Sequence, residues 1–294
     1  DKKKAMTDLS HKLEDFSIEN SSLSNNTLYY AVISDTGSNT DAFYYYNLEL
    51  LKKTVQAAKS GSAPYGYRVH YAVKANANPV FALISQQGLG ADCVSGNEIR
   101  QALECGFAAD TIVYAGVGKS DAEIELALQH DIFCFNCESL PEIQVIDGIA
   151  ARLGKKARIA LRINPNVDAH THHYITTGIE ETNSDLFDDL EHVITEVAKL
   201  KQIELIGLHF HIGSQITDMT VFRGLCIRAN EIQRQMKERG LLLPHINFGG
   251  LGIDYNEPYE KPIADFQSYF ATFARFFEPE PHSRFISNWD ARSS

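Results

Sequence analysis

The chain has 294 residues, of which 44% are apolar and 22% are charged. This composition supports a large buried core and excludes disordered and fibrous proteins. The 27 Lys and Arg against 38 Asp and Glu give a formal net charge of −11, which argues against nucleic acid or an anionic membrane as a partner. No apolar run approaches the ~18 residues of a membrane span, and the N-terminal residues lack the apolar region of a secretory signal. Five Cys in a chain of this length do not indicate a disulfide framework, so we expect a soluble cytoplasmic protein.

Short apolar runs alternate along the chain with longer segments of helical periodicity. Strands are expected at Val69–Val73, Gly90–Val94, Thr111–Ala115, Asp131–Phe135, Ala157–Ile163, Glu204–His211, His245–Phe248 and Arg284–Ser287. A helix at Leu48–Ala58 precedes them, and the helices between them are expected at Pro79–Gln87, Gly96–Cys105, Asp121–Gln129, Ser139–Arg152, Asp185–Leu200, Met219–Arg239 and Ile263–Phe276.

This alternation predicts parallel strands joined by helical crossovers. Eight strands separated by seven helices favour an α/β fold of the (β/α)8 TIM-barrel type. A doubly wound sheet is the alternative, but it normally has a glycine-rich turn after its first strand, and that turn here reads KANANP. We expect residues 1–27 to be a loosely ordered leader, 28–288 the barrel and 289–294 a tail.

Lys74 directly follows the first expected strand. In barrels of this kind the active site lies at the C-terminal ends of the strands. A lysine after a buried strand must extend to solvent or lose its charge, and an enclosed lysine of depressed pKa is a Schiff-base nucleophile. An ordinary exposed lysine is the alternative interpretation.

The seventh expected strand is followed by a glycine-rich turn with Gly249, Gly250 and Gly252. Barrels frequently bind phosphate at the loops after their seventh and eighth strands, where main-chain N–H groups contact the anion. Glycine permits this close approach of the main chain. A tight turn without a ligand uses glycine as well, so the position in the barrel strengthens the phosphate interpretation.

The sixth expected strand carries His209 and His211, which share one face because they lie two residues apart. Two imidazoles could bind a divalent metal, as in a barrel hydrolase, although no carboxylate partner is apparent. Alternatively, one imidazole stacks on a planar cofactor while Gly213 and Ser214 hold its phosphate. For His209 by itself we favour a core histidine.

Further polar residues stand at other strand ends. Arg162 lies on the fifth expected strand and could orient an anion or a ring oxygen. Asp92 and Glu98 flank the end of the second, and Asp92 either holds a positive group or caps the helix that begins near Gly96.

Two other patterns are interpreted as unrelated to the site. His170, His172 and His173 are expected to be solvated loop residues. Cys134 and Cys137 have the C-x-x-C spacing of redox and metal motifs, but a thioredoxin-like site requires this spacing at a helix start in a different fold.

Five segments occur in order at these strand ends: YAVKANAN, GLGADCVSGNEI, RINPNVDAHTHHYITTG, GLHFHIGSQITD and NFGGLGIDY. Together they closely resemble the diaminopimelate decarboxylases, a family of alanine-racemase-like barrel decarboxylases that use pyridoxal 5'-phosphate. The resemblance covers roughly residues 40–270. The amino-acid sequences of the third and fourth segments resemble those of the diaminopimelate branch and not those of the ornithine branch.

The resemblance implies a role for each matching residue. Lys74 would carry the pyridoxal phosphate covalently, and His211 would stack on its ring, so these two are the expected catalytic residues. Ser214, Gly249 and Gly250 would hold the phosphate, while Arg162 and Asp92 would support the lysine. The implied reaction is decarboxylation of meso-2,6-diaminopimelate to L-lysine and CO2 in the cytoplasm, by a homodimer. An ornithine- or arginine-type substrate is the second choice.

The chain departs from the family pattern in several places. It has two consecutive glycines where the family usually has three, and it lacks a Lys-Phe-Gly segment after ITTG. Glu280 and Arg284 are the nearest match to the Glu that contacts the pyridine nitrogen and the Arg that contacts substrate, with one residue too many between them. The family's C-terminal β domain is expected to be absent, and a strand near Leu28–Ile33 would then lose its partner. A pyridoxal-binding barrel without decarboxylase activity, and the metal-dependent hydrolase, therefore stay as alternatives.

Overall fold

The computed structural model describes residues 48–74, 80–165, 190–213, 216, 218–250, 263–279 and 284–289. Its strands are β1 Arg68–Ala72, β2 Gly90–Cys93, β3 Ile112–Tyr114, β4 Cys134–Cys137, β5 Ala157–Ile163, β6 Ile203–Phe210, β7 His245–Gly250 and β8 Arg284–Trp289. Its helices are α2 Leu48–Ser62, α3 Val80–Gln86, α4 Gly96–Glu104, α5 Asp121–Gln129, α6 Leu140–Leu153, α7 Leu190–Val197, α8 Met219–Glu238 and α9 Phe266–Phe276, with short 3-10 turns at Ala63–Tyr65 and Ala109–Thr111.

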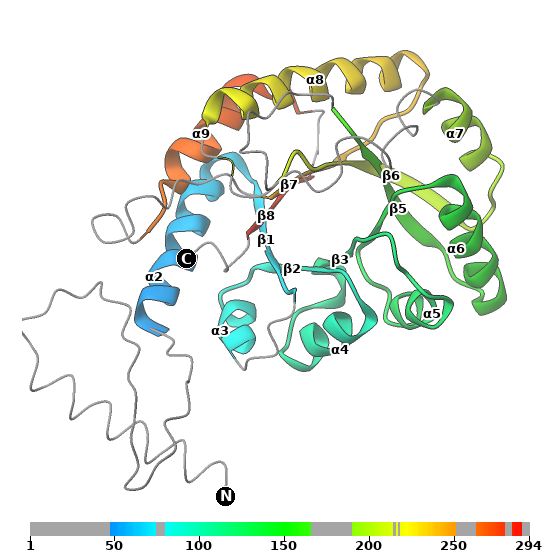
Figure 1. Ribbon diagram of the computed structural model, residues 1–294, viewed down its shortest axis with the longest axis horizontal. Helices are drawn as coiled ribbons and strands as arrows, with labels where there is room; N and C mark the ends of the chain where they lie inside the picture. The colour runs from blue at the N-terminus through cyan, green and yellow to red at the C-terminus, as the bar shows by residue number, and fades with distance from the viewer. Residues whose placement is uncertain are drawn as a thin grey trace, which may run out of the picture. The chain divides into compact units, whose positions relative to one another are not determined.

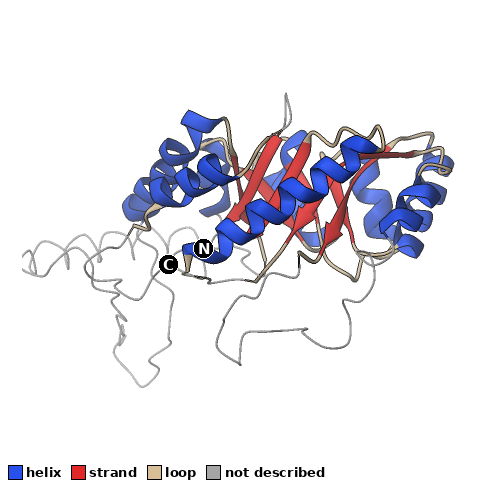
Figure 2. Cartoon of the chain, turned by 90° about the horizontal axis from the view of Figure 1, so that it is seen from above, coloured by secondary structure: helices blue, strands red, loops and turns tan. Residues whose placement is uncertain are grey.

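The strands form a closed parallel barrel in the order β1 to β8, with β8 paired to β1. The helices surround the strands as an outer ring (Figure 1), and seen from above they cover the outside of the sheet (Figure 2). The predicted (β/α)8 barrel is thus confirmed. The leader, the strand near Leu28–Ile33 and residues 290–294 of the expected tail lie outside the described residues, while β8 extends to Trp289.

Most elements begin and end within a few residues of their expected bounds, and β5 and α5 match residue for residue. Strand β4 is shifted along the chain: it runs from Cys134 to Cys137 and not over Asp131–Phe135. Asp131 has a positive φ of 53°, and its N–H and that of Ile132 donate to carbonyls of α5. Residues 131 and 132 therefore end the preceding helix, and the apolar run continues into the strand only from Cys134.

The barrel interior contains an apolar cluster of Val113, Phe133, Cys134, Ala160 and Ile286. These residues come from β3, β4, β5 and β8 and from the residue just before β4, so they meet inside the barrel. Side chains of a strand alternate between its two faces, and the cluster therefore identifies the inward-facing positions of these strands.

A polar layer follows this cluster toward the C-terminal ends of the strands. Asn136 and Arg162 lie two positions beyond inward-facing residues of β4 and β5. His209 is in register with Arg162, and Asn247 with His209, so both share this layer. The amide atoms of Asn136 and Nδ1 of His209 are buried with no hydrogen-bond partner among the described residues. Buried polar groups are rarely left unpaired, and unpaired groups concentrate at functional sites.

On the outside, helix α9 packs on β7 through aromatic side chains. The ring centroid of Phe248 on β7 lies 4.9 Å from those of Phe273 and Phe277. Asp265 begins α9 as its N-cap, since its side chain accepts from the N–H of Ser268. This aromatic packing holds β7 against the outer helix. In the part of the chain that is described, no helix has the length and apolar character that crossing a membrane requires.

Candidate active site

Lys74 lies two residues beyond the end of β1, at the C-terminal mouth of the barrel, and is partly buried. Its φ of 46° is in the left-handed region, which is uncommon for a residue other than glycine. The preceding residue is fixed by a hydrogen bond from the Val73 N–H to the Asp92 carbonyl, 3.0 Å long. Unusual backbone conformations of this kind cluster at functional sites, and the conformation is consistent with the predicted role of Lys74.

Asp92 is an inward-facing residue of β2, in register with Ala72 of β1. The pKa of its carboxyl is raised to about 7, chiefly by burial and next by the nearby Glu98 carboxylate. The positive charges of Lys74, Arg162 and Lys119 act in the opposite direction. Asp92 is therefore a buried acid within electrostatic reach of the lysine, and near neutral pH it can be present in either protonation state.

The interpretation of Asp92 as a helix cap is wrong. Ser95 is the N-cap of α4, and its side chain accepts from the Glu98 N–H at 3.3 Å. Glu98 in turn accepts from the Val94 N–H at 2.8 Å. These two residues satisfy the start of the helix, so the Asp92 carboxyl is left to the barrel interior.

His211 follows directly after β6, and its ring centroid is 6.5 Å from that of His209. Burial lowers the pKa of His211 to about 4, assisted by the positive charges of Arg162 and Lys74. Burial likewise holds the pKa of His209 well below its ordinary value. Both imidazoles are therefore neutral at physiological pH. A neutral ring at the barrel mouth is suited to stacking against a planar group, while His209 lies deeper, as a core histidine does.

Gly249, with a φ of 70°, brings the end of β7 against the end of β6. A Cβ at this position would lie 2.6 Å from the Phe210 carbonyl oxygen and 2.7 Å from His211 Nδ1. The Gly249 N–H donates to Asn247 Oδ1 at 2.9 Å. No side chain fits here, so only glycine allows the main chain to approach the imidazole this closely. Gly250 is the last residue of β7, and Gly252 lies outside the described residues.

Arg162 forms an ion pair with Glu138, in which its Nη1 donates to Glu138 Oε1 at 2.9 Å. Glu138 is the residue that follows β4. Glu138 is not among the predicted site residues, because the expected strand ended at Phe135 and the actual one ends at Cys137. The correct strand end is the signal that identifies it, since strand-end residues line the active site of such barrels.

Three predicted site residues are not brought into this arrangement. Ser214 and Glu280 lie outside the described residues. The main chain of Arg284 begins β8 and pairs with His245, the first residue of β7. It is therefore at the opposite end of the barrel, roughly 17 Å along the strand direction from the mouth. The loop histidines His170, His172 and His173 also lie outside the described residues.

Cys134 and Cys137 are not arranged as a redox pair. They occupy the first and last positions of a four-residue strand and therefore point to opposite faces. Both are free and buried, and burial raises the pKa of each thiol. Among the described residues, no group of three or more His, Cys, Asp or Glu is arranged to hold a metal ion.

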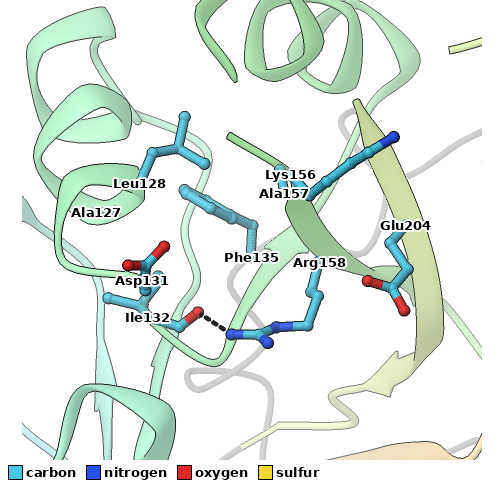
Figure 3. Close-up of a pocket in the computed structure, with 9 residues that line it drawn as sticks. All are labelled: Ala127, Leu128, Asp131, Ile132, Phe135, Lys156, Ala157, Arg158 and Glu204. Carbon is cyan, nitrogen blue, oxygen red and sulfur yellow. Dashed lines mark hydrogen bonds between the residues drawn. The ribbon is translucent and has the colours of Figure 1, made fainter. Parts of the chain in front are cut away.

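A separate pocket of about 260 Å³ lies where β5 and β6 begin. Figure 3 shows the Arg158 guanidinium donating to the main-chain carbonyl of Ile132, over 2.9 Å. Asp131, which also lines this pocket, is bound by Lys155 at 2.8 Å. The pocket is at the end of the barrel opposite Lys74, and protein groups already pair with two of its charges, so we do not include it in the site.

The residues at the mouth suit pyridoxal phosphate. Lys74 would supply an amine for the cofactor aldehyde, and His211 a neutral ring for stacking. Gly249 has no side chain, so a phosphate could come close to the main chain there. Asp92 and Arg162 add an acid and a positive charge within electrostatic reach of the lysine and the imidazole. A parallel barrel with this set of groups defines the class of barrel proteins that bind a pyridoxal cofactor. The chain belongs to the pyridoxal-dependent decarboxylases, because the model of their pyridoxal binding domain matches residues 48–284.

Three similar proteins of this family are diaminopimelate decarboxylases. Over 244 residues the chain is 52% identical to a diaminopimelate decarboxylase of Bacteroides thetaiotaomicron, covering 82% of this chain and 63% of the relative. It is 38% identical over 231 residues to the diaminopimelate decarboxylase of Aquifex aeolicus, covering 76% and 54%. The crystal structure of the Helicobacter pylori diaminopimelate decarboxylase complexed with L-lysine superimposes with a TM-score of 0.75 at 34% identity, covering 84% of this chain and 62% of that one. The chain thus spans between half and two thirds of the length of these relatives.

Proposed function

We propose that this chain is the pyridoxal-binding barrel of a diaminopimelate decarboxylase, which removes one carboxylate of meso-2,6-diaminopimelate to give L-lysine and CO2. The observation that carries the proposal is the meeting of Lys74, His211 and Gly249 at one end of the barrel. The 52% identity to the Bacteroides thetaiotaomicron enzyme supports this choice of substrate. The family's setting in amino-acid synthesis supports a cytoplasmic location.

Each residue has a separate task in this proposal. The Lys74 amine binds the cofactor aldehyde, and the bound cofactor supplies the electron sink for decarboxylation. His211 presents a neutral ring, because burial lowers its pKa to about 4, and this ring stacks on the planar cofactor. Gly249, Gly250 and Ser214 hold the phosphate. Since the Gly249 N–H already donates to Asn247, Gly249 contributes open space, and the donors come from the other residues.

Asp92 and Arg162 lie under the lysine in this arrangement. The Asp92 carboxyl, with a pKa of about 7, is able to take up or release a proton beside Lys74 Nζ. Arg162 balances the negative charge that a phosphate or a substrate carboxylate brings into the barrel mouth. Both residues act on the charge of the site, and neither forms a bond to the substrate.

The first experiment is a cofactor trap. The chain is incubated with pyridoxal phosphate, reduced with borohydride and digested, and the pyridoxyl group is located by mass spectrometry. We expect the label on Lys74 and none in Lys74→Ala, while Lys59→Ala on the outer helix α2 is labelled like the wild type. Label on another lysine, or equal labelling of Lys74→Ala, would refute the assignment.

The second experiment separates the substrate alternatives. Release of CO2 is measured from diaminopimelate, ornithine and arginine with the same preparation. Release from diaminopimelate alone supports the proposal, whereas preference for ornithine or arginine moves the chain to the other branch. A labelled Lys74 without CO2 release from any of the three identifies a pyridoxal-binding barrel that is not itself a decarboxylase. Light scattering then tests the proposed homodimer.

A further inference from the structure

Glu138 and Arg162 connect two neighbouring strands at the barrel mouth. Arg162 is on β5, in register with His209 on β6, and Glu138 follows β4. The Arg162 side chain is 30% exposed and that of Glu138 11%. The bond between them, 2.9 Å long, uses one of the five N–H donors of the guanidinium. Toward the other described residues no further bond of this group is found, which leaves N–H donors for an anion that enters the mouth.

Arg162 is also within electrostatic reach of the other site residues. Its positive charge lowers the pKa of His211 and of His209, in each case as the largest contribution after burial. It also opposes the rise in the pKa of Asp92. A change in the position of this guanidinium therefore alters the electrostatic environment of His211, His209 and Asp92.

Glu138 is itself held in place by its surroundings. Its N–H donates to Glu142 Oε2 at 2.8 Å, and Glu142 Oε1 accepts from Lys119 Nζ at 2.6 Å. The Lys119 side chain is 1% exposed and also donates to the carbonyls of Gly116 and Asn136. A fully paired buried ammonium thus anchors the turn from β4 into α6. The backbone of Glu138 is therefore held in place, and its carboxylate extends from this fixed position toward Arg162.

We propose that Glu138 is a positioning residue of the cofactor site, which holds the Arg162 guanidinium at the barrel mouth in the orientation that binds pyridoxal phosphate. The assignment rests on the proposed function. A carboxylate–guanidinium pair is directional, so removing the carboxylate frees the arginine to turn toward solvent. A displacement of about 1 Å in a site of this kind can cost roughly 100-fold in activity.

The test compares Glu138→Gln with a matched ion-pair variant. Glu125→Gln removes the carboxylate partner of Arg152, which is 2.7 Å away between α5 and α6, outside the barrel. For each variant, the dissociation constant of pyridoxal phosphate and the absorption spectrum of the bound cofactor are measured, together with the Tm of the cofactor-free chain. We expect Glu138→Gln to weaken cofactor binding by about 10- to 100-fold and to shift the absorption band, and Glu125→Gln to do neither.

Two further variants separate positioning from folding. Glu138→Asp keeps the charge, and we expect it to restore part of the affinity and the wild-type band. In an Arg162→Gln background, adding Glu138→Gln should change the affinity less than 2-fold, because residues that act through one another are not additive.

Unchanged affinity and spectrum in Glu138→Gln, with or without a lower Tm, would overturn the assignment and leave the proposed function intact. So would full additivity in the double variant. A wild-type chain that takes up no pyridoxal phosphate would instead overturn the proposed function, and this assignment with it.

Discussion

Replacing Gly249 with alanine tests whether the end of β7 is packed against His211 as closely as described. Two costs add. The φ of 70° places the new residue in the left-handed region, at about 1–2 kcal/mol. Its Cβ would also lie 2.6 Å from the Phe210 carbonyl oxygen and 2.7 Å from His211 Nδ1, so the backbone of β6 must shift, at about 1–3 kcal/mol. We expect Gly249→Ala to lose about 2–5 kcal/mol of unfolding free energy.

Two other glycines separate these costs. Gly154, the C-cap of α6, has a φ of 65° and no atom within 4 Å of a built Cβ, so Gly154→Ala should lose only the conformational part. Gly148, inside α6, also has open space but an ordinary φ, so Gly148→Ala should gain about 0.5–1 kcal/mol. Unfolding in urea of the three cofactor-free variants measures all three values.

The difference between Gly249→Ala and Gly154→Ala therefore reports the clash with β6 alone. Cofactor affinity should fall in Gly249→Ala and stay unchanged in the other two, since only Gly249 lies beside His211. If Gly249→Ala were no more destabilising than Gly154→Ala, the close approach of β7 to β6 would be refuted.

Lys119→Met should lower the unfolding free energy by about 3–5 kcal/mol, because it leaves the largely buried Glu142 carboxylate without its ion-pair partner; thermal or urea unfolding measures this. Stability should also fall as the pH is lowered below about 6.5 toward 4. His70, His209 and His211 have depressed pKa values in the folded chain, so the unfolded chain binds more protons in this range. Each such proton contributes about 1.4 kcal/mol per pH unit, which urea unfolding at several pH values would detect.

Both predictions have internal controls. Lys52→Met breaks a solvent-exposed pair with Glu49 on α2 and should change stability by less than about 1 kcal/mol. Asp92 has the opposite effect on the pH dependence of stability. Because its pKa is raised in the folded chain, the folded chain binds one more proton than the unfolded chain at this residue between about pH 4 and 7. Asp92→Asn should therefore steepen the loss of stability on acidification. A flat pH profile, or equal effects of the two lysine variants, would contradict the burial described here.

The sequence predicted the barrel because alternating strands and helices have few other solutions, and the barrel rule then placed Lys74, His211 and Gly249 at one end. Each of these residues lies at the end of a strand that can be recognised from the apolar pattern of the strand itself, so short-range sequence information is enough to place it. β4 shows where such patterns fail. The preceding residues Ile132 and Phe133 are as apolar as a strand, but the Ile132 N–H donates to Ala127 of α5, and residue pairing of β4 with β3 begins only at Cys134.

The expected strand ended two residues too early, at Phe135, and Glu138, which follows the strand at its actual end, was therefore missed. The pairing of Glu138 with Arg162 joins residues 24 positions apart, and nothing in the local sequence specifies it. Asp92 illustrates a different limit. A carboxylate shortly before a helix is often its N-cap, so the sequence alone allows this role for Asp92. The pairing of β2 with β1 and β3 places Asp92 toward the barrel interior, and Ser95 caps α4 instead.

The pairing of β1 with β8 closes the barrel and joins Arg68 to Ile286. These residues are far apart in the chain, so barrel closure is a late, long-range event in folding. During synthesis β1 leaves the ribosome first, and until β8 follows, its outer side is an open edge that can pair with another chain. The strand that leads into Lys74 is thus the last to gain its second neighbour. A nascent chain should acquire its affinity for the cofactor only after residue 289 has emerged, and chaperone contact is most needed in that interval.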